Sequence, residues 1–65
     1  PYKSDLAFKI LELVERHQLL APEGLLVIEH LKSSALPENC GKLKAGSIRS
    51  YGQTSLSFYF LSQDD

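Results

Sequence analysis

With 65 residues, the chain is long enough for one small domain, which buries only about 60% of its unfolded surface. Its one cysteine excludes an internal disulfide, and one cysteine with two histidines falls short of the ligand spacings of a zinc site. The formal net charge of −1 excludes a general electrostatic attraction to nucleic acid, and no apolar run approaches the ~20 residues of a membrane span.

The first predicted element is a helix over residues 5–20. Asp5 places a negative charge in the first turn, where the helix dipole favours it. Residues 21–24, which include a proline and a glycine, are expected to end the helix. The residues at helical spacing that we expect to form one apolar stripe, with a partly buried structural histidine at its end, are Leu6, Ile10, Leu13, Val14 and His17.

Residues 25–28 form a continuous apolar run and predict a strand over residues 25–29. Because apolar side chains do not alternate with polar ones, we expect this strand to be buried on both faces inside a parallel sheet. Such a strand needs neighbouring strands and covering helices that 65 residues with one helix do not supply. The chain also starts at Pro1 and contains no methionine, so we expect it to be a piece of a longer polypeptide.

The rest of the chain predicts a connection and a hairpin. Residues 31–41 are expected to connect, with at most one helical turn, to a strand over residues 42–51. Gly52 and Gln53 are the turn candidate, because glycine adopts a positive φ at little cost. Residues 54–61 alternate, with even-numbered residues facing one way and odd-numbered residues the other. The expected fold is therefore α/β, with a helix, a buried parallel strand and an antiparallel β-hairpin.

Three segments of the chain resemble motifs of one enzyme family, in the same order. Pro1-Tyr2 is similar to the end of a D-P-P-Y motif, and residues 24–30 (GLLVIEH) to a strand that ends in Glu-His. Residues 51–59 (YGQTSLSFY) are similar to a Y-G-x-T-x-x-S ending, the most distinctive of the three, and residues 31–45 match least. By these motifs the chain resembles the RsmD-type family, bacterial guanine-N2 methyltransferases of small-subunit ribosomal RNA.

The resemblance implies a fold, an activity and partners. Residues 1–65 would be the C-terminal piece of a Rossmann-like, single-domain methyltransferase, starting inside the D-P-P-Y motif, with the N-terminal cofactor-binding half absent. The whole enzyme would transfer a methyl group from S-adenosylmethionine to an exocyclic guanine amine, and this piece would be inactive alone. Its partner would be ribosomal RNA or a ribosomal assembly intermediate in the cytoplasm, with no membrane and no metal.

The free Cys40 fits a reducing compartment and lies in no nucleophile motif, so we do not expect it to be catalytic.

The resemblance also implies site residues. An aryl amine is a poor nucleophile because its lone pair is delocalised into the ring. A D-P-P-Y loop therefore aims hydrogen-bond acceptors at the amine while its aromatic residue stacks on the target base. The expected catalytic residues are Pro1, which fixes the loop, and Tyr2, which stacks, with the main acceptor upstream. The expected substrate-binding residues are Lys3, Glu29, His30, Arg49 and Tyr51, and we expect no cofactor-binding residue within this chain.

Several of these residues have alternative interpretations. Glu29 and His30 follow a buried strand, where open α/β sheets bind ligands, or they form a strand-end pair that hydrogen-bonds a neighbouring loop. Lys3, Lys32 and Arg49 either contact RNA phosphates or are simply solvated. The alternative function is a non-catalytic α/β interaction module that docks through an exposed strand edge.

Overall fold

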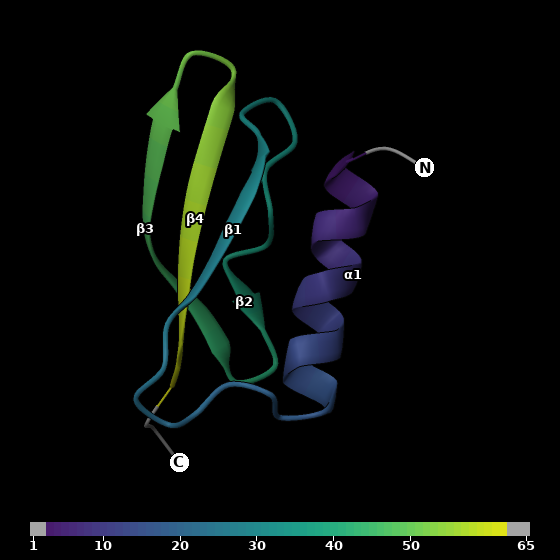
Figure 1. The fold of residues 1–65 in the computed structure, drawn as a ribbon, viewed down its shortest axis with the longest axis vertical. Coiled ribbons are helices and arrows are strands. Elements are labelled where there is room, and N and C mark those ends of the chain that lie inside the picture. The colour runs from purple at the N-terminus through teal and green to yellow at the C-terminus, as the bar shows by residue number, and fades with distance from the viewer. Residues whose placement is uncertain (1–2, 63–65) are drawn as a thin grey trace.

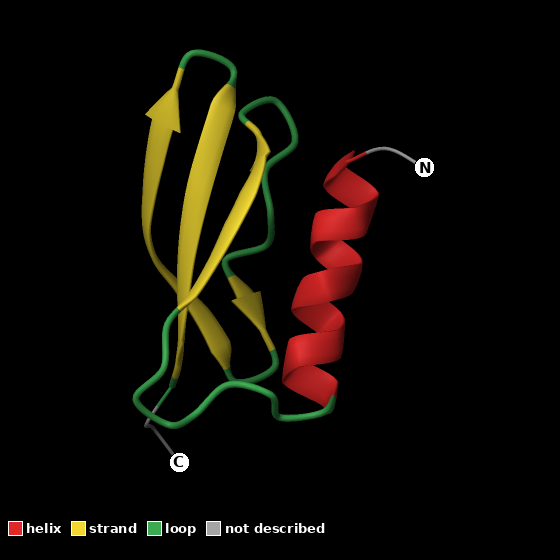
Figure 2. Ribbon diagram, viewed as in Figure 1, coloured by secondary structure: helices red, strands yellow, loops and turns green. Residues whose placement is uncertain are grey.

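The fold consists of one helix and a four-stranded sheet (Figures 1 and 2). The elements are α1 (Lys3–Arg16), β1 (Leu26–Leu31), β2 (Asn39–Cys40), β3 (Leu43–Tyr51) and β4 (Thr54–Leu61). The computed structural model describes residues 3–62, with side chains from Leu6 onward. Within that part of the chain the strand order is β1-β4-β3-β2, and every strand pair is antiparallel.

The expected fold class is wrong. We predicted an α/β fold, the C-terminal piece of a Rossmann-like methyltransferase with a buried parallel strand, but β1 pairs antiparallel with β4, and residues 3–62 contain no parallel pair. The tight β3–β4 hairpin returns β4 between β3 and β1, so β4 is the antiparallel neighbour of both. A continuous apolar run carries no information on strand direction. Nor is β1 buried on both faces, because Val27 is 45% exposed and Leu31 is 39% exposed.

The C-terminal hairpin is confirmed. β3 and β4 pair along their lengths, and the turn between them lies at Gly52, whose φ is 61°. β4 alternates as predicted, with Ser55, Ser57 and Tyr59 buried on one face. The connection before β3 contains the short strand β2, which the sequence did not predict, in place of a helical turn. β2 pairs with the start of β3 across a turn at Gly41, whose φ is 58°.

Helix α1 ends earlier than the predicted residues 5–20, before the proline and glycine that were expected to stop it. Gln18 has a positive φ of 50°, a conformation that a non-glycine residue rarely adopts. Its amide donates to the carbonyl of Glu15 (3.2 Å), and the amide of Leu19 donates to the carbonyl of Val14 (3.0 Å). These two bonds form a Schellman motif, which satisfies the last carbonyls of the helix and turns the chain toward β1.

The buried stripe of α1 is not the predicted one. Ala7 and Leu11 are buried and Val14 is partly buried, whereas the predicted Leu6 and Ile10 are 59% and 40% exposed. Leu13 and His17 are exposed as well, so His17 is not a partly buried structural histidine. Both sets of residues recur at helical spacing, and apolar side chains cover much of the helix circumference. Periodicity alone therefore could not decide which side faces the sheet.

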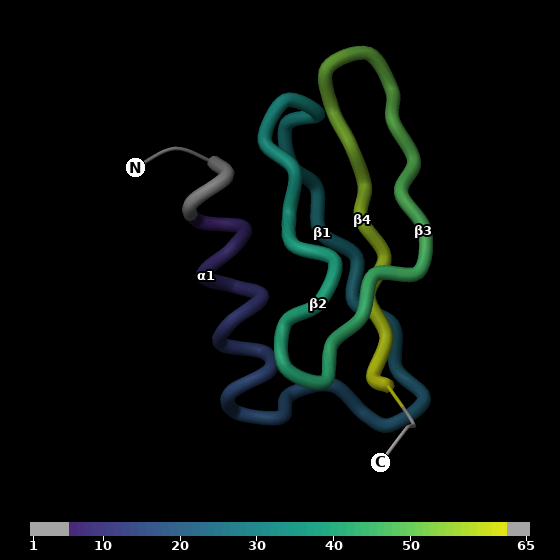
Figure 3. The backbone as a smooth tube through the Cα atoms, turned by 180° about the vertical axis from the view of Figure 1, so that it is seen from behind, coloured from purple at the N-terminus to yellow at the C-terminus, as the bar shows by residue number. Residues whose placement is uncertain are grey.

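The core lies between α1 and the concave face of the sheet. α1 contacts both edge strands, β1 and β2, so the sheet curls around the helix (Figure 3). A register shift between Ala45 and Ser47 marks a bulge in β3, which increases the local twist. The hydroxyl of Tyr59 donates to the carbonyl of Pro37 (2.5 Å), which holds the connection over the core. The buried hydrophobic residues are Ala7, Leu11, Ile28, Leu43 and Tyr59.

Candidate functional site

Those predicted site residues that the structure describes gather at one end of the molecule. At this end β1 finishes, β3 turns into β4, and the N-terminal end of α1 lies nearby (Figure 1). Lys3 is the first residue of α1. The predicted catalytic residues Pro1 and Tyr2 lie outside the described residues. The fold therefore places this end of the sheet near the start of α1.

Glu29, Arg49 and Tyr51 lie on the face of the sheet that α1 does not cover. Glu29 and Arg49 are both paired with Leu56 of β4, so the three residues form one row across three strands. Tyr51 is paired with Thr54 in the next row toward the hairpin turn, and it is 61% exposed. A carboxylate, a guanidinium and a phenol are thus presented to solvent on one face.

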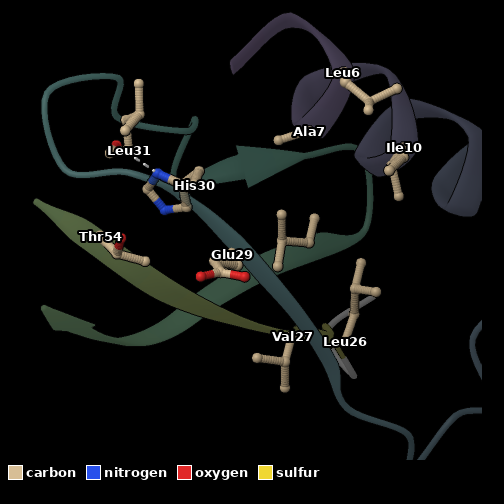
Figure 4. A pocket seen from close by; sticks show the side chains of 10 residues that line it. Leu6, Ala7, Ile10, Leu26, Val27, Glu29, His30, Leu31 and Thr54 are labelled. Carbon is tan, nitrogen blue, oxygen red and sulfur yellow. Dashed lines mark hydrogen bonds between the residues drawn. The ribbon is translucent and has the colours of Figure 1, made fainter. Parts of the chain in front are cut away.

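His30 lies on the opposite face from Glu29, because successive side chains of a strand point to opposite sides. It is only 5% exposed, and its Nε2 lies 2.7 Å from the Oγ of Ser57. Its Nδ1 lies 3.0 Å from the carbonyl oxygen of Leu31 (Figure 4) and 3.1 Å from that of Ser34. His30 therefore bonds the neighbouring loop, as the second interpretation of the Glu-His pair had it. The sequence did not predict Ser57 as the partner of His30, although Ser57 is the serine of the Tyr-Gly-x-Thr-x-x-Ser segment.

The turn that follows β1 lies against the β3–β4 turn. The amide of Lys32 donates to the carbonyl of Gln53 (2.7 Å), and the amide of Ser34 donates to the carbonyl of Leu31 (3.0 Å). The exposed Lys32 thereby joins the two turns through its backbone while its side chain is accessible to solvent. The residues that line the shallow hollow between the turns are Leu31, Lys32, Ser33, Gly52 and Gln53.

An open groove of about 380 Å³ runs along β1 beside the first turns of α1 (Figure 4). Within residues 3–62, β1 is paired along one edge only, with β4. Lys32 directs its amide toward the β4 side, so by alternation the backbone groups of Val27 and Glu29 point to the unpaired edge. The side chains that line the groove are mostly apolar: Leu6, Ala7, Ile10, Leu26, Val27, Ile28, Glu29, His30, Leu31 and Thr54.

Two titratable groups near β2 are perturbed. Burial, followed by the charges of Glu15 and Glu12, raises the pKa of the Cys40 thiol. Burial also raises the pKa of Tyr59, with a smaller effect of Cys40. A raised pKa lowers the thiolate fraction of Cys40 at a given pH, and the thiolate is the reactive form.

Residues 3–62 contain neither a cluster of metal-ligating side chains nor a helix able to span a membrane. No group of three or more His, Cys, Asp or Glu side chains in this part of the chain is arranged to hold a metal ion. The helix in this range is too short and too polar to cross a membrane.

The chain matches a known protein family along most of its length. The family described as "Conserved hypothetical protein 95" matches residues 1–60. A relative from Bacillus subtilis (strain 168), named "Putative rRNA methyltransferase YlbH", is 34% identical over 59 residues, which make up 91% of this chain and 32% of the relative. The chain thus spans about a third of the length of that curated relative, and no solved structure matches it. The chain belongs to the Conserved hypothetical protein 95 family, the RsmD-type family that its three motifs predicted.

Proposed function

We propose that residues 1–65 are the C-terminal part of a single-domain, S-adenosylmethionine-dependent methyltransferase that modifies the exocyclic N2 amine of a guanine in ribosomal RNA. The observation that carries this proposal is the family match over residues 1–60, together with the name of the Bacillus subtilis relative. The substrate would be ribosomal RNA or a ribosomal assembly intermediate, and the enzyme would therefore act in the cytoplasm. The remainder of the domain would supply the cofactor-binding half.

The surface of the chain supports its being part of a larger domain. Large apolar side chains are exposed on α1 beside the unpaired edge of β1 and on the uncovered face of the sheet. Four of these side chains, on α1 and β1, line one open groove, and contiguous apolar surface of this kind marks a place where another protein surface packs. The alternative function was docking onto a partner through an exposed strand edge. Under the present proposal the same edge would instead join this chain to the rest of its own domain. The side chains concerned are Leu6, Ile10, Leu13, Val27, Leu31 and Phe60.

The described residues do not by themselves fit S-adenosylmethionine. The cofactor carries a ribose, an α-amino group and a carboxylate, which together need several polar partners. The groove along β1 offers the carboxylate of Glu29 and the hydroxyl of Thr54, while both ring nitrogens of His30 already bond protein groups. We therefore assign the cofactor site mostly to the rest of the domain and no cofactor contact to this chain.

In the proposed site, Pro1 fixes the loop before α1 and Tyr2 stacks on the target guanine. The amine needs to be held with its lone pair directed at the methyl donor, which is a matter of position rather than of proton transfer. Lys3 and Arg49 would contact RNA phosphates, and Tyr51 with Glu29 would contact the nucleotides beside the target. The support for this grouping is that the start of α1, the end of β1 and the hairpin turn share one end of the molecule (Figure 1).

The test is to replace Tyr2 in the longer enzyme with alanine and, separately, with phenylalanine. Base–aromatic stacking is worth about 1–3 kcal/mol, so Tyr2→Phe should keep most of the single-turnover methylation rate on ribosomal RNA. Tyr2→Ala should lose roughly 100-fold, because misplacing a reacting atom by about 1 Å costs that much, while cofactor affinity and melting temperature stay near wild type. Tyr2→Ala methylating at the wild-type rate would remove Tyr2 from the site.

Micromolar binding of the cofactor to the isolated 65-residue chain, measured by calorimetry, would contradict the proposed division of the domain.

A further inference from the structure

His30 and Ser57 are buried together on the face of the sheet that α1 covers. They are 5% and 2% exposed, lie 27 residues apart in the sequence, and their Nε2 and Oγ atoms are 2.7 Å apart. The β1–β4 register places His30 opposite Ser55 and Ser57 opposite Ile28, so the bonded pair are diagonal neighbours. Each belongs to one of the motifs singled out in the sequence, and neither has a part in the proposed methyl transfer.

The partners of His30 fix which ring nitrogen carries the proton. Nδ1 faces only the carbonyl oxygens of Leu31 and Ser34, and a carbonyl oxygen can only accept a hydrogen bond. In the neutral imidazole Nδ1 therefore donates, and Nε2 is left as an acceptor. Since Nε2 accepts, the Ser57 hydroxyl must donate to it. The result is one directed chain of bonds from Ser57 through His30 to the loop carbonyls.

This chain of bonds holds the turn after β1 in place. The Leu31 carbonyl that accepts from Nδ1 also accepts from the amide of Ser34 (3.0 Å), which closes the turn. Between them, the amide of Lys32 bonds Gln53 in the β3–β4 turn (2.7 Å). Losing the Ser57 hydroxyl would leave a buried imidazole nitrogen without a partner and weaken the anchor of this turn.

We infer that His30 and Ser57 are positioning residues, which hold the turn carrying Lys32 against the Gly52–Gln53 turn so that the two turns form one rigid RNA-contacting surface. The bond network is a property of this chain, whereas its use in RNA binding rests on the proposed function. His30 then acts on the substrate through Lys32 rather than by contact, since its ring is buried and both nitrogens are occupied.

The test compares Ser57→Ala with Ser55→Ala in the longer enzyme. Ser55 is an ideal control because it lies on the same strand and face, is also 2% exposed, and bonds Ser50 (2.9 Å) instead of His30. We expect the amide of Lys32 to exchange with solvent about tenfold faster in Ser57→Ala, the equivalent of one lost buried bond, and at the wild-type rate in Ser55→Ala. The KM for RNA should rise about tenfold in Ser57→Ala with kcat nearly unchanged, and Ser57→Thr, which keeps the hydroxyl, should restore it.

The other possible results separate the structural role of the His30–Ser57 pair from its role in RNA binding. An unchanged exchange rate at Lys32 in Ser57→Ala, or an equal rise in Ser55→Ala, shows that the pair does not hold the turn. Faster exchange at Lys32 with an unchanged KM overturns the role in RNA binding. Should the wild-type enzyme methylate no RNA, the proposed function fails, while the exchange of Lys32 still decides the structural role. If Ser57→Thr unfolds from crowding, the conservative variant is His30→Gln with Ser57 intact, because its amide has N–H donors for the loop carbonyls and an oxygen that accepts from Ser57; it should keep the KM near wild type.

Discussion

The two faces of the sheet both depart in part from the usual pattern, because the covered face buries polar beside apolar side chains and the uncovered face exposes apolar beside polar ones. An antiparallel sheet with one covered face normally buries apolar side chains there and exposes polar ones. In β4 the face under α1 instead buries Ser55 and Ser57, each 2% exposed, while Phe60 on the uncovered face is 38% exposed. The neighbouring strand is mixed in the same way: it buries His30 beside Ile28 on the covered face, and it exposes Val27 (45%) beside Glu29 on the other.

The difference shows which face is complete. On the covered face the polar groups have partners, and no buried side-chain nitrogen or oxygen within the described part of the chain lacks a hydrogen bond. The uncovered face is different, because its apolar side chains, including Phe58 and Phe60, face away from α1 and are not covered by it. The polar groups of the covered face therefore need no further partner. On the uncovered face, the part around Phe58 and Phe60 is apolar and has the character of a surface on which another element packs, while the row with Glu29 and Arg49 is polar.

The largest expected effect tests this difference directly, by truncating one residue on each face in the longer protein. Leu43→Ala, on the covered face at 0% exposed, should lower the free energy of unfolding by about 2–5 kcal/mol. Phe60→Ala should cost about 3 kcal/mol or more despite its 38% exposure here, because we expect its face to be buried in the complete domain. Urea unfolding gives both values. Lys44→Ala, at the position paired with Phe60, is the control and should cost less than about 0.5 kcal/mol.

If Phe60→Ala costs as little as Lys44→Ala, the uncovered face stays open in the longer protein. The exposed apolar side chains would then need another partner, and the argument that the chain is one part of a larger domain would lose its structural support.

The contrast between the faces also explains what the sequence could predict. The alternation of residue types in residues 54–61 predicted the hairpin and the two faces of β4 correctly, because successive side chains of any strand point to opposite faces. It could not tell which side α1 covers, since serines on a covered face run against the usual rule. The direction of β1 failed for a related reason: residues 25–28 are apolar throughout, and such a run fits a parallel strand or the rim of an antiparallel sheet equally well.

The site was predicted in part. The Glu-His and Tyr-Gly motifs led to residues that the fold brings to one end of the molecule. They did not predict the hydrogen bond between His30 and Ser57. That His30 reaches Ser57 depends on the register of β1 against β4, which pairs residues 27 apart and has no local sequence signal. The functional roles of all the site residues remain predictions, and Pro1 and Tyr2 also lie outside the described residues.

A smaller effect concerns the covered face at high pH. Burial, and to a lesser degree Cys40, raises the pKa of Tyr59, so the folded state favours the neutral phenol that donates to the Pro37 carbonyl. A raised pKa gives stability that is present below the unfolded value and is lost as pH rises past it. Stability should therefore fall above about pH 10, the ordinary pKa of tyrosine. Urea midpoints between pH 8 and 11 should fall less steeply in Tyr59→Phe, which at neutral pH costs about 1 kcal/mol. An equal slope in the variant would show that Tyr59 is not the responsible group.

The smallest expected effect is at the turn that keeps α1 on the covered face. Gln18 ends the helix with a φ of 50°, where an L-residue costs roughly 1–2 kcal/mol and glycine does not. Gln18→Gly should therefore raise the free energy of unfolding by about 0.5–1 kcal/mol, after the larger chain entropy of unfolded glycine is subtracted. Gly52→Ala is the reverse control: its φ is 61° and no atom lies within 4 Å of the added Cβ, so only the backbone cost of about 1 kcal/mol remains. Paired urea unfolding of the two variants should give shifts of opposite sign. A loss of stability in Gln18→Gly would mean that the Gln18 side chain, rather than the backbone turn alone, helps hold the helix against the sheet.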